Sequence, residues 1–199
     1  MNSDSETKKT SRGRLVIFSG PSGVGKTTIL KRLFDQCTLP IQESVSATTR
    51  QRRPGETQGV SYHYLTQEEF QQRIEDDEFL EYTEVFSRGD LYGTLKTPVK
   101  EALEAGQWII LEIDVVGALK VLKIHPDAIT IFVHPGSIEE LERRLRGRAT
   151  ESEQALTRRL EVAGGELEAS AHYEHIVNND SVEQTVTEIC QILMANANL

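Results

Sequence analysis

The sequence predicts an α/β fold in which helices flank a parallel β-sheet, with a small mixed α+β insertion. A glycine-rich stretch joins an apolar, strand-like run to a segment of helical periodicity. Its 199 residues fit one domain with inserted subdomains. Between the first two buried runs lies a long stretch rich in tyrosine and hydroxyl side chains, which we assign to the insertion, residues 44–95. The runs that predict buried parallel strands are 15–19, 108–114 and 128–133.

The glycine-rich stretch fits G-x-x-x-x-G-K-[ST], the phosphate-binding loop. It follows the strand-like run, and apolar residues at positions 29, 30, 33 and 34 continue it at helical spacing. A chance glycine-rich turn is the alternative, and the strand and helix on either side argue against it. Backbone N–H groups of such a loop surround phosphate oxygens, the lysine reaches the transferring phosphates and the threonine can bind Mg²⁺. The stretch is Gly20-Pro21-Ser22-Gly23-Val24-Gly25-Lys26-Thr27, with Thr28 next to it.

Residues 44–56 begin like a strand and become a loop rich in hydroxyls and arginines, including Arg50, Arg52 and Arg53. Guanidinium groups and hydroxyls suit a phosphate monoester, although a solvated loop is the alternative. Strands are expected at 60–65, 79–86 and 90–94. Thr66, with Glu69 three residues later, predicts a capping box and a helix through about Asp77.

The core resumes with Thr97-Pro98 as a predicted helix start and Gly106 as its stop. The second buried run ends in Glu112 and Asp114 at its carboxyl end, where parallel sheets place their ligands. An acid in this place typically supports Mg²⁺ beside a glycine loop, but Asp114 could also cap the next helix.

The last third predicts three helices and a strand. Ser137 with Glu140, and Thr150 with Glu153, form capping-box patterns before arginine-rich helices. Gly164-Gly165 should weaken the middle of the second helix. A short strand at 175–179 precedes a closing helix, which Ser181 caps and which runs to about Met194.

Composition limits the possible functions. The net charge is −9, which argues against a nucleic-acid binder, yet six of the 14 arginines fall between Arg143 and Arg159. Cys37 and Cys190 lack metal-ligand spacing and read as core thiols of a reducing compartment. Residues 1–13 are polar and lack the apolar centre of a signal peptide, so we expect a frayed tail and a cytoplasmic protein without a membrane partner.

Several motifs in order resemble the guanylate kinase family, from about Arg14 to Met194. They are SGPSGVGKTT (19–28), SVSATTRQRRPGE (44–56), FLEY (79–82), LYGT (91–94), LEID (111–114), RRLRGRATES (143–152) and VNND (177–180). The resemblance implies a P-loop NTPase core, a GMP-binding insertion and an arginine-bearing helical lid. The implied divisions are 14–43, 96–135 and 161–199 for the core, 44–95 for the insertion and 136–160 for the lid.

The resemblance also implies a reaction, transfer of the γ-phosphoryl group of ATP to GMP, and roles for matching residues. Arg50, Arg53, Tyr62 and Tyr92 would hold the GMP phosphate. Glu81 would accept from the guanine ring N–H and amine, and Ser46 and Thr94 would donate to the guanine carbonyl. Glu112 would complete the GMP site. Lys26, Arg144, Arg148 and Arg159 would surround the ATP phosphates, with Arg50 counted among the catalytic cations.

Asn178 would lie near adenine, and Thr27 and Asp114 would support Mg²⁺. Three positions depart from the family pattern: Glu112 where Asp is frequent, Val116 where Gln is frequent, and Ala149 where Gly is common. A kinase of another phosphorylated acceptor, and a non-catalytic interaction module of the same fold, are the alternatives. The oligomeric state, a monomer or small homo-oligomer, stays open.

Overall fold

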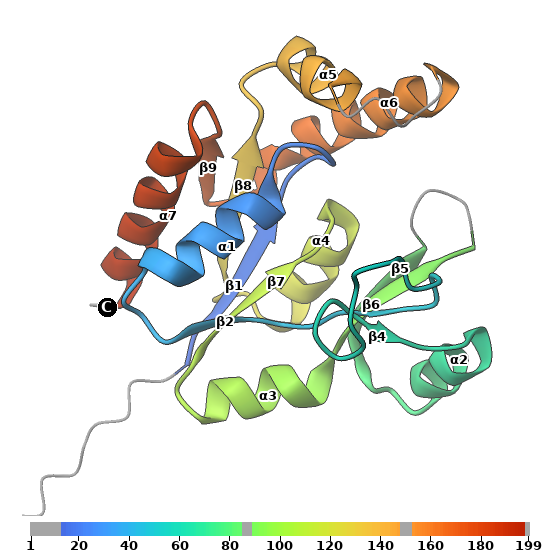
Figure 1. Ribbon diagram of the computed structural model, residues 1–199. Helices are drawn as coiled ribbons and strands as arrows, with labels where there is room; N and C mark the ends of the chain where they lie inside the picture. Colours follow the sequence, from blue (N-terminus) through green and yellow to red (C-terminus); the bar gives the residue numbers. More distant parts are fainter. Residues whose placement is uncertain (1–12, 85–88, 148–152, 198–199) are drawn as a thin grey trace, which may run out of the picture.

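The centre of the protein is a five-stranded parallel sheet with the strand order β2-β7-β1-β8-β9 (Figure 1). The structure is a computed structural model that describes residues 13–84, 89–147 and 153–197. Every neighbouring pair in the sheet is parallel, which confirms the predicted α/β class. The strands are β1 (Leu15–Ser19), β2 (Ile41–Glu43), β7 (Trp108–Glu112), β8 (Ile129–His134) and β9 (His175–Asn178).

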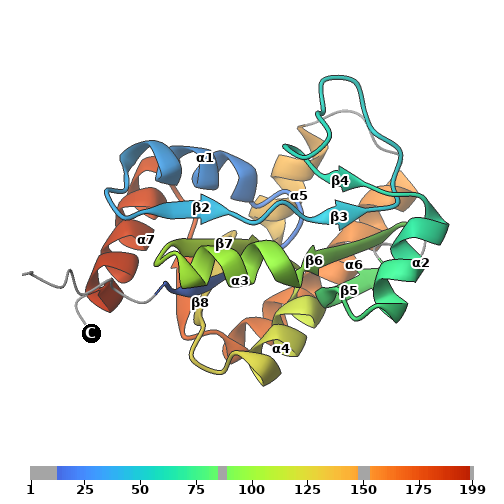
Figure 2. The same cartoon turned by 90° about the horizontal axis from the view of Figure 1, so that it is seen from below.

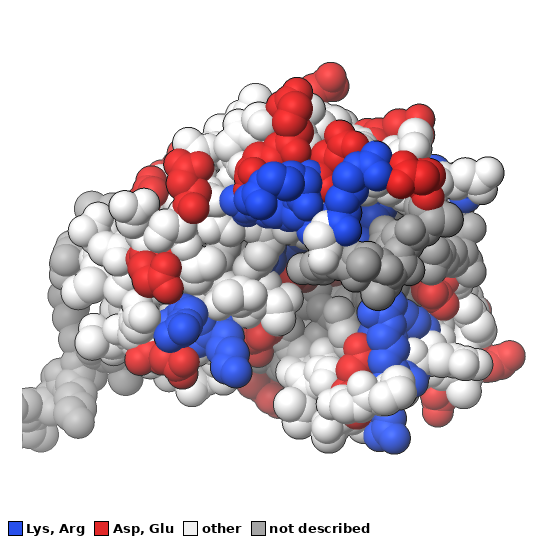
Figure 3. Space-filling model, turned by 45° about the horizontal axis from the view of Figure 1, so that its top comes forward, with Lys and Arg blue, Asp and Glu red and all other residues white. Residues whose placement is uncertain are grey.

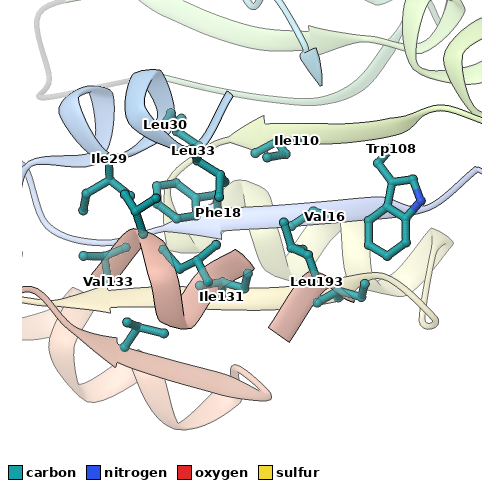
Figure 4. Packing of buried hydrophobic residues seen from close by; sticks show 14 of the residues in the cluster. Val16, Phe18, Ile29, Leu30, Leu33, Trp108, Ile110, Ile131, Val133 and Leu193 are labelled. Atoms are coloured by element: carbon teal, nitrogen blue, oxygen red, sulfur yellow. The ribbon is translucent and has the colours of Figure 1, made fainter. Parts of the chain in front are cut away.

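Helices cover both faces of this sheet, which explains why β1 is apolar at every position from Leu15 to Phe18. Val16 and Phe18 point to one face, where they pack with residues of α1 and α7 (Figure 4). Leu15 and Ile17 point to the other face and pack with α3 and α4. The helices are α1 (Lys26–Gln36), α3 (Lys96–Glu104), α4 (Val115–Ile124) and α7 (Val182–Ala197).

A second, four-stranded sheet with the order β4-β3-β6-β5 lies beside the first and is built by the predicted insertion. The chain enters it directly from β2 and leaves it from β6 straight into α3 (Figure 2). Phe70 of α2 stacks on Phe79 of β5, with ring centroids 4.3 Å apart, and forms its small core. The elements are β3 (Ala47–Thr48), β4 (His63–Tyr64), α2 (Gln67–Glu75), β5 (Phe79–Glu84) and β6 (Leu91–Leu95).

Two helices, α5 (Ile138–Arg146) and α6 (Glu153–Ala169), form a separate layer beyond the carboxyl edge of the central sheet (Figure 1). They pack on each other through Leu141, Leu145 and Leu156. The expected weakness at Gly164-Gly165 does not interrupt α6, which continues through both glycines to the 3₁₀ turn η1 (Ser170–His172). The capping pattern that begins at Thr150 lies outside the described residues, as do Arg148 and Ala149.

Several predicted helix ends are confirmed. The Thr66 hydroxyl accepts from the Glu69 amide and the Glu69 carboxylate accepts from the Thr66 amide, a complete capping box. Ser137 accepts from the Glu140 amide at the start of α5. Gly106 follows α3 with φ of 75°, a conformation that glycine adopts without strain.

Three boundaries predicted from sequence were wrong. Thr97 does not cap α3, because β6 runs directly into the helix and Leu95 takes the N-cap position. The strand expected at 60–65 shrinks to β4, because the chain turns at 57–61, where the Ser61 amide bonds the Thr57 carbonyl. The strand expected at 108–114 ends at Glu112, since Asp114 caps α4 through the Gly117 amide.

The two cysteines, far apart in sequence, both pack against the core between α1 and α7, and both are free thiols. Burial and a hydrogen bond with Cys37 raise the pKa of Cys190 to about 11. Among the described residues, none of the helices combines the length and the apolar character required to cross a membrane.

Candidate active site

A cavity of about 510 Å³ opens at the carboxyl edge of the central sheet and extends to the second sheet. In Figure 3, basic side chains lie on both sides of a hollow in this face. Pro21, Val24, Thr94, Arg144 and Asn178 do not line the cavity. The predicted site residues that do line it are Gly20, Ser22, Gly23, Gly25, Lys26, Thr27, Thr28, Ser46, Arg50, Arg53, Tyr62, Glu81, Tyr92, Glu112, Asp114 and Arg159.

The phosphate loop connects β1 to α1 and forms one end of the cavity. Gly23 and Gly25 have φ of 94° and 107°, which side-chain-bearing residues rarely adopt. Gly25 is the N-cap of α1, so the free amides at the start of that helix point toward the loop. The Lys26 amine donates to the Gly20 carbonyl at 2.7 Å, which places a positive charge inside the loop.

The outer side of the loop is held by Asn179 and Arg144. The Asn179 amide Nδ2 donates to the Val24 carbonyl at 2.6 Å, and Arg144 donates to the same carbonyl at 3.3 Å. Arg144 also donates to the Asn179 carbonyl at 2.7 Å and pairs with Glu140. In this conformation Arg144 therefore supports the loop backbone.

Asn179 is the asparagine beside the phosphate loop, whereas Asn178, predicted to lie near adenine, does not line the cavity. Asn178 is exposed, whereas Asn179 is 4% exposed. The alternation of inward-facing and outward-facing residues along a strand could have identified Asn179 from the sequence. Val177 is buried, so the side chain two residues later points inward as well.

Between the loop and the second sheet, Arg50 forms the centre of a cluster with tyrosines. Its Nε donates to the Tyr92 hydroxyl at 3.0 Å, and its guanidinium lies 5.4 Å from the Tyr62 ring centroid. Glu56 accepts from both terminal nitrogens of Arg50 and from the Tyr64 hydroxyl. These bonds, the one from Arg50 above all, lower the pKa of Glu56 to about 2. Glu56 and Tyr64 were not among the predicted site residues.

On the side of the cavity formed by the second sheet, Glu81 of β5 and Thr94 of β6 form a buried polar pair. The Thr94 hydroxyl donates to Glu81 Oε1 at 2.7 Å, and the two residues are 1% and 5% exposed respectively. Burial raises the pKa of Glu81, and the Thr94 hydrogen bond opposes that shift. Thr94 thus gives its one hydroxyl hydrogen to Glu81, so in this conformation it has none left for a ligand carbonyl.

Further acids surround the middle of the cavity. Burial raises the pKa of Glu112, and the Lys26 charge opposes this. Glu166 of α6, which sequence reasoning missed, has its pKa raised to about 7 by burial, again opposed by Lys26 and reinforced by Asp114. Glu43 of β2 is a second missed acid; it keeps contact with solvent, and partial desolvation and the Glu112 charge raise its pKa.

The oxygen donors around Lys26 fit a magnesium ion carried by a nucleotide. Thr27, Glu112 and Asp114 offer a hydroxyl and two carboxylates to one cavity. Within the described ranges, no group of three or more His, Cys, Asp or Glu side chains forms a metal cage. Mg²⁺ bound through one or two carboxylates, waters and substrate phosphates needs no such cage.

A phosphate loop on a parallel sheet of this order, with a second sheet closing the same cavity, defines a nucleotide kinase of the phosphate-loop class. The family model "Guanylate kinase" matches residues 12–196. The chain belongs to the guanylate kinase family, and it is an enzyme of that family.

Named relatives cover most of the chain. It is 56% identical to a guanylate kinase of Rhodopirellula baltica over 92% of this chain and 88% of the relative. It is 47% identical to one of Clostridium perfringens, over 94% of this chain and 85% of the relative. The crystal structure of guanylate kinase from Anaplasma phagocytophilum superposes with a TM-score of 0.77 at 30% identity, covering 94% of this chain and 87% of that one.

Proposed function

We propose that this kinase transfers the γ-phosphoryl group of ATP to the phosphate of GMP, giving ADP and GDP. The observation that supports this reaction is the single cavity that joins the phosphate loop to the buried Glu81–Thr94 pair. A GMP phosphate oxygen forms a bond to the γ-phosphorus, and the bond between that phosphorus and the bridging oxygen of ADP breaks. The attacking oxygen is already ionised, so no side chain has to remove a proton from it.

The phosphate of GMP is assigned to Arg50, Arg53, Tyr62 and Tyr92. Arg50 is already oriented by Tyr92 and Glu56, so little rotamer freedom has to be lost when an anion arrives. Two guanidinium groups and phenolic hydroxyls fix the position of a dianion and its angle of attack. When the GMP phosphate binds, it would take the place of the Glu56 carboxylate as the partner of Arg50.

Guanine is assigned to the Glu81 end of the cavity. Its ring N–H and neighbouring amine present two donors on one edge, and a carboxylate accepts both. Ser46 lines the cavity and would donate to the guanine carbonyl, while Thr94 orients Glu81 from behind. Adenine presents a different pattern and would leave a buried carboxylate without donors, which is costly.

The triphosphate of ATP is assigned to the loop from Gly20 to Thr28, with Lys26 stabilising the charge that spreads over the transferring oxygens. Arg159 of α6 lines the cavity and adds positive charge from the opposite side. Arg144 of α5 and Arg148, which lies outside the described residues, are assigned to the same phosphates. We assign Mg²⁺ to Thr27, with Asp114 or Glu112 as the acidic support. The ion neutralises phosphate charge when it is bound.

We infer a cytoplasmic enzyme that recycles GMP in purine nucleotide metabolism, active as a monomer or small homo-oligomer. The test is ATP consumption with Mg²⁺ and, in turn, GMP, AMP, CMP and UMP. ADP release with GMP alone is expected. Equal rates with several acceptors would remove the assigned base specificity. No rate with any of them, in a folded protein that binds ATP, would instead favour a kinase of another phosphorylated acceptor.

A further inference from the structure

We propose that Gly117 is a specificity-determining position, because only a residue without a side chain leaves room for the Glu81 carboxylate in the position that suits guanine. This inference rests on the proposed function. Gly117 lies in the first turn of α4, and its amide donates to Asp114 Oδ1 at 2.7 Å. No loop or turn explains a glycine at this position, since it lies inside a regular helix.

The geometry at Gly117 leaves no room for a methyl group. A Cβ atom built there would lie 2.7 Å from Glu81 Oε2 and 3.2 Å from Glu81 Cδ. Real Cβ atoms show almost no contacts below 3.0 Å, so the carboxylate would have to move. The third neighbour, Asp114 Oδ1, would lie at 3.4 Å, an ordinary contact. The clash therefore involves Glu81 alone.

Neither partner can move without consequence. Glu81 Oε1 already accepts from Thr94 on the opposite side, and the residue is 5% exposed. One turn further along α4, the Lys120 amine donates to the carbonyl of Tyr82, the residue after Glu81. This bond adds to the packing of α4 against β5, so a retreat of the helix would disturb that packing. The methyl group would instead push the carboxylate away from its present position.

A displaced carboxylate changes recognition more than it changes folding. The side-chain end of a glutamate can rotate at modest cost, and alanine is a better helix former than glycine by about 1 kcal/mol. Guanine recognition, in contrast, depends on two hydrogen bonds to one carboxylate in one orientation. Gly117 is thus a positioning residue, which acts on the base through Glu81 and touches no reacting atom.

The test compares nucleotide affinities of Gly117→Ala and the wild type by calorimetry. We expect the dissociation constant for GMP to rise at least about tenfold, which corresponds to the loss of one well-placed charged hydrogen bond. ATP affinity should be unchanged, and thermal stability should be unchanged or higher. IMP lacks the amine but keeps the phosphate and ribose. The preference for GMP over IMP should therefore shrink in the variant.

Gly165→Ala is the matched control, since a Cβ at Gly165 of α6 would meet nothing within 4 Å. It should raise stability without changing GMP affinity. Glu81→Asp provides the second arm, because a shorter side chain withdraws the carboxylate from Gly117. If Gly117 acts through Glu81, adding Gly117→Ala to Glu81→Asp should cost less than about twofold further, well short of additive.

The outcomes separate the two proposals. A wild type that does not bind GMP would overturn the proposed function itself. A wild type that binds GMP, with a Gly117→Ala variant of equal GMP affinity and equal preference over IMP, would overturn the role of Gly117. Additive losses in the double variant would also overturn it, since the glycine would then act independently of the carboxylate.

Discussion

Replacing Glu81 by glutamine should change stability and activity in opposite directions. The substitution preserves the shape of the side chain and removes its charge. Burial and the nearby Asp114 carboxylate raise the pKa of Glu81, so the ionised group opposes folding above its ordinary pKa. The amide oxygen of glutamine can still accept the Thr94 hydroxyl. The free variant should therefore unfold at a higher urea concentration than the wild type at pH 8.

The same change should remove GMP recognition. Hydrogen bonds to a charged acceptor contribute about 1.5–3 kcal/mol each, and the amide NH₂ would face a guanine donor. Two such bonds correspond to roughly 3–6 kcal/mol, or about 10²–10⁴-fold in kcat/KM for GMP. The assay is steady-state ADP release at varied GMP with saturating ATP, together with ATP affinity measured by calorimetry. The dissociation constant for ATP should stay within about twofold, since Glu81 belongs to β5 of the second sheet whereas the phosphate loop follows β1 of the first.

Glu84→Gln is the control for this substitution. Glu84 is three residues along the same strand, is exposed and does not line the cavity. It should behave as the wild type in both assays. A Glu81→Gln variant that lost stability, and lost ATP and GMP binding equally, would refute the reasoning, because Glu81 would then be a structural residue of β5.

Three further predictions concern other groups. Lys26→Ala should lower kcat by on the order of 10²-fold or more, because removing one group that stabilises the transition-state charge costs about 3 kcal/mol. Near-normal turnover would contradict the mechanism. Glu166 has a pKa raised from 4.5 to about 7, so the free energy of unfolding of the wild type should fall by roughly 1–2 kcal/mol, after solvent screening, as pH rises through that window. Urea titrations of the Glu166→Gln variant should lack this fall. Parallel curves of unfolding free energy against pH for the two proteins would disprove the prediction. Cys190, with its pKa near 11, should react with iodoacetamide at pH 8 roughly a hundredfold more slowly than the unfolded chain, as mass spectrometry would measure.

The elements that could be predicted from sequence are those that local chemistry determines. The run from Leu15 to Ser19 is apolar because both faces of β1 are covered, and this pattern alone identifies a central strand. The Thr66–Glu69 capping box contains all its partners within four residues. The glycine loop likewise needs only its own backbone and the helix that follows.

The errors arise where distant contacts decide. Thr97-Pro98 resembles a helix start, but the pairing of β6 with β5 continues to Leu95 and brings the helix forward. Asn179 bonds a carbonyl 155 residues away, and Glu166 approaches Lys26 only when α6 crosses above the sheet. Glu56 pairs with Arg50 because the loop between them folds back on itself, and the local sequence pattern does not predict this.

The short connections to the second sheet have a consequence for the entropy of binding. Only residues 44–46 separate β2 from β3, and no residue separates β6 from α3. Two such short crossings leave little chain whose conformation could change between the two sheets. The parts of the cavity contributed by the two sheets are therefore held close together at little cost in chain entropy. Lengthening either crossing with glycines would raise that entropy cost while leaving every contacting residue unchanged.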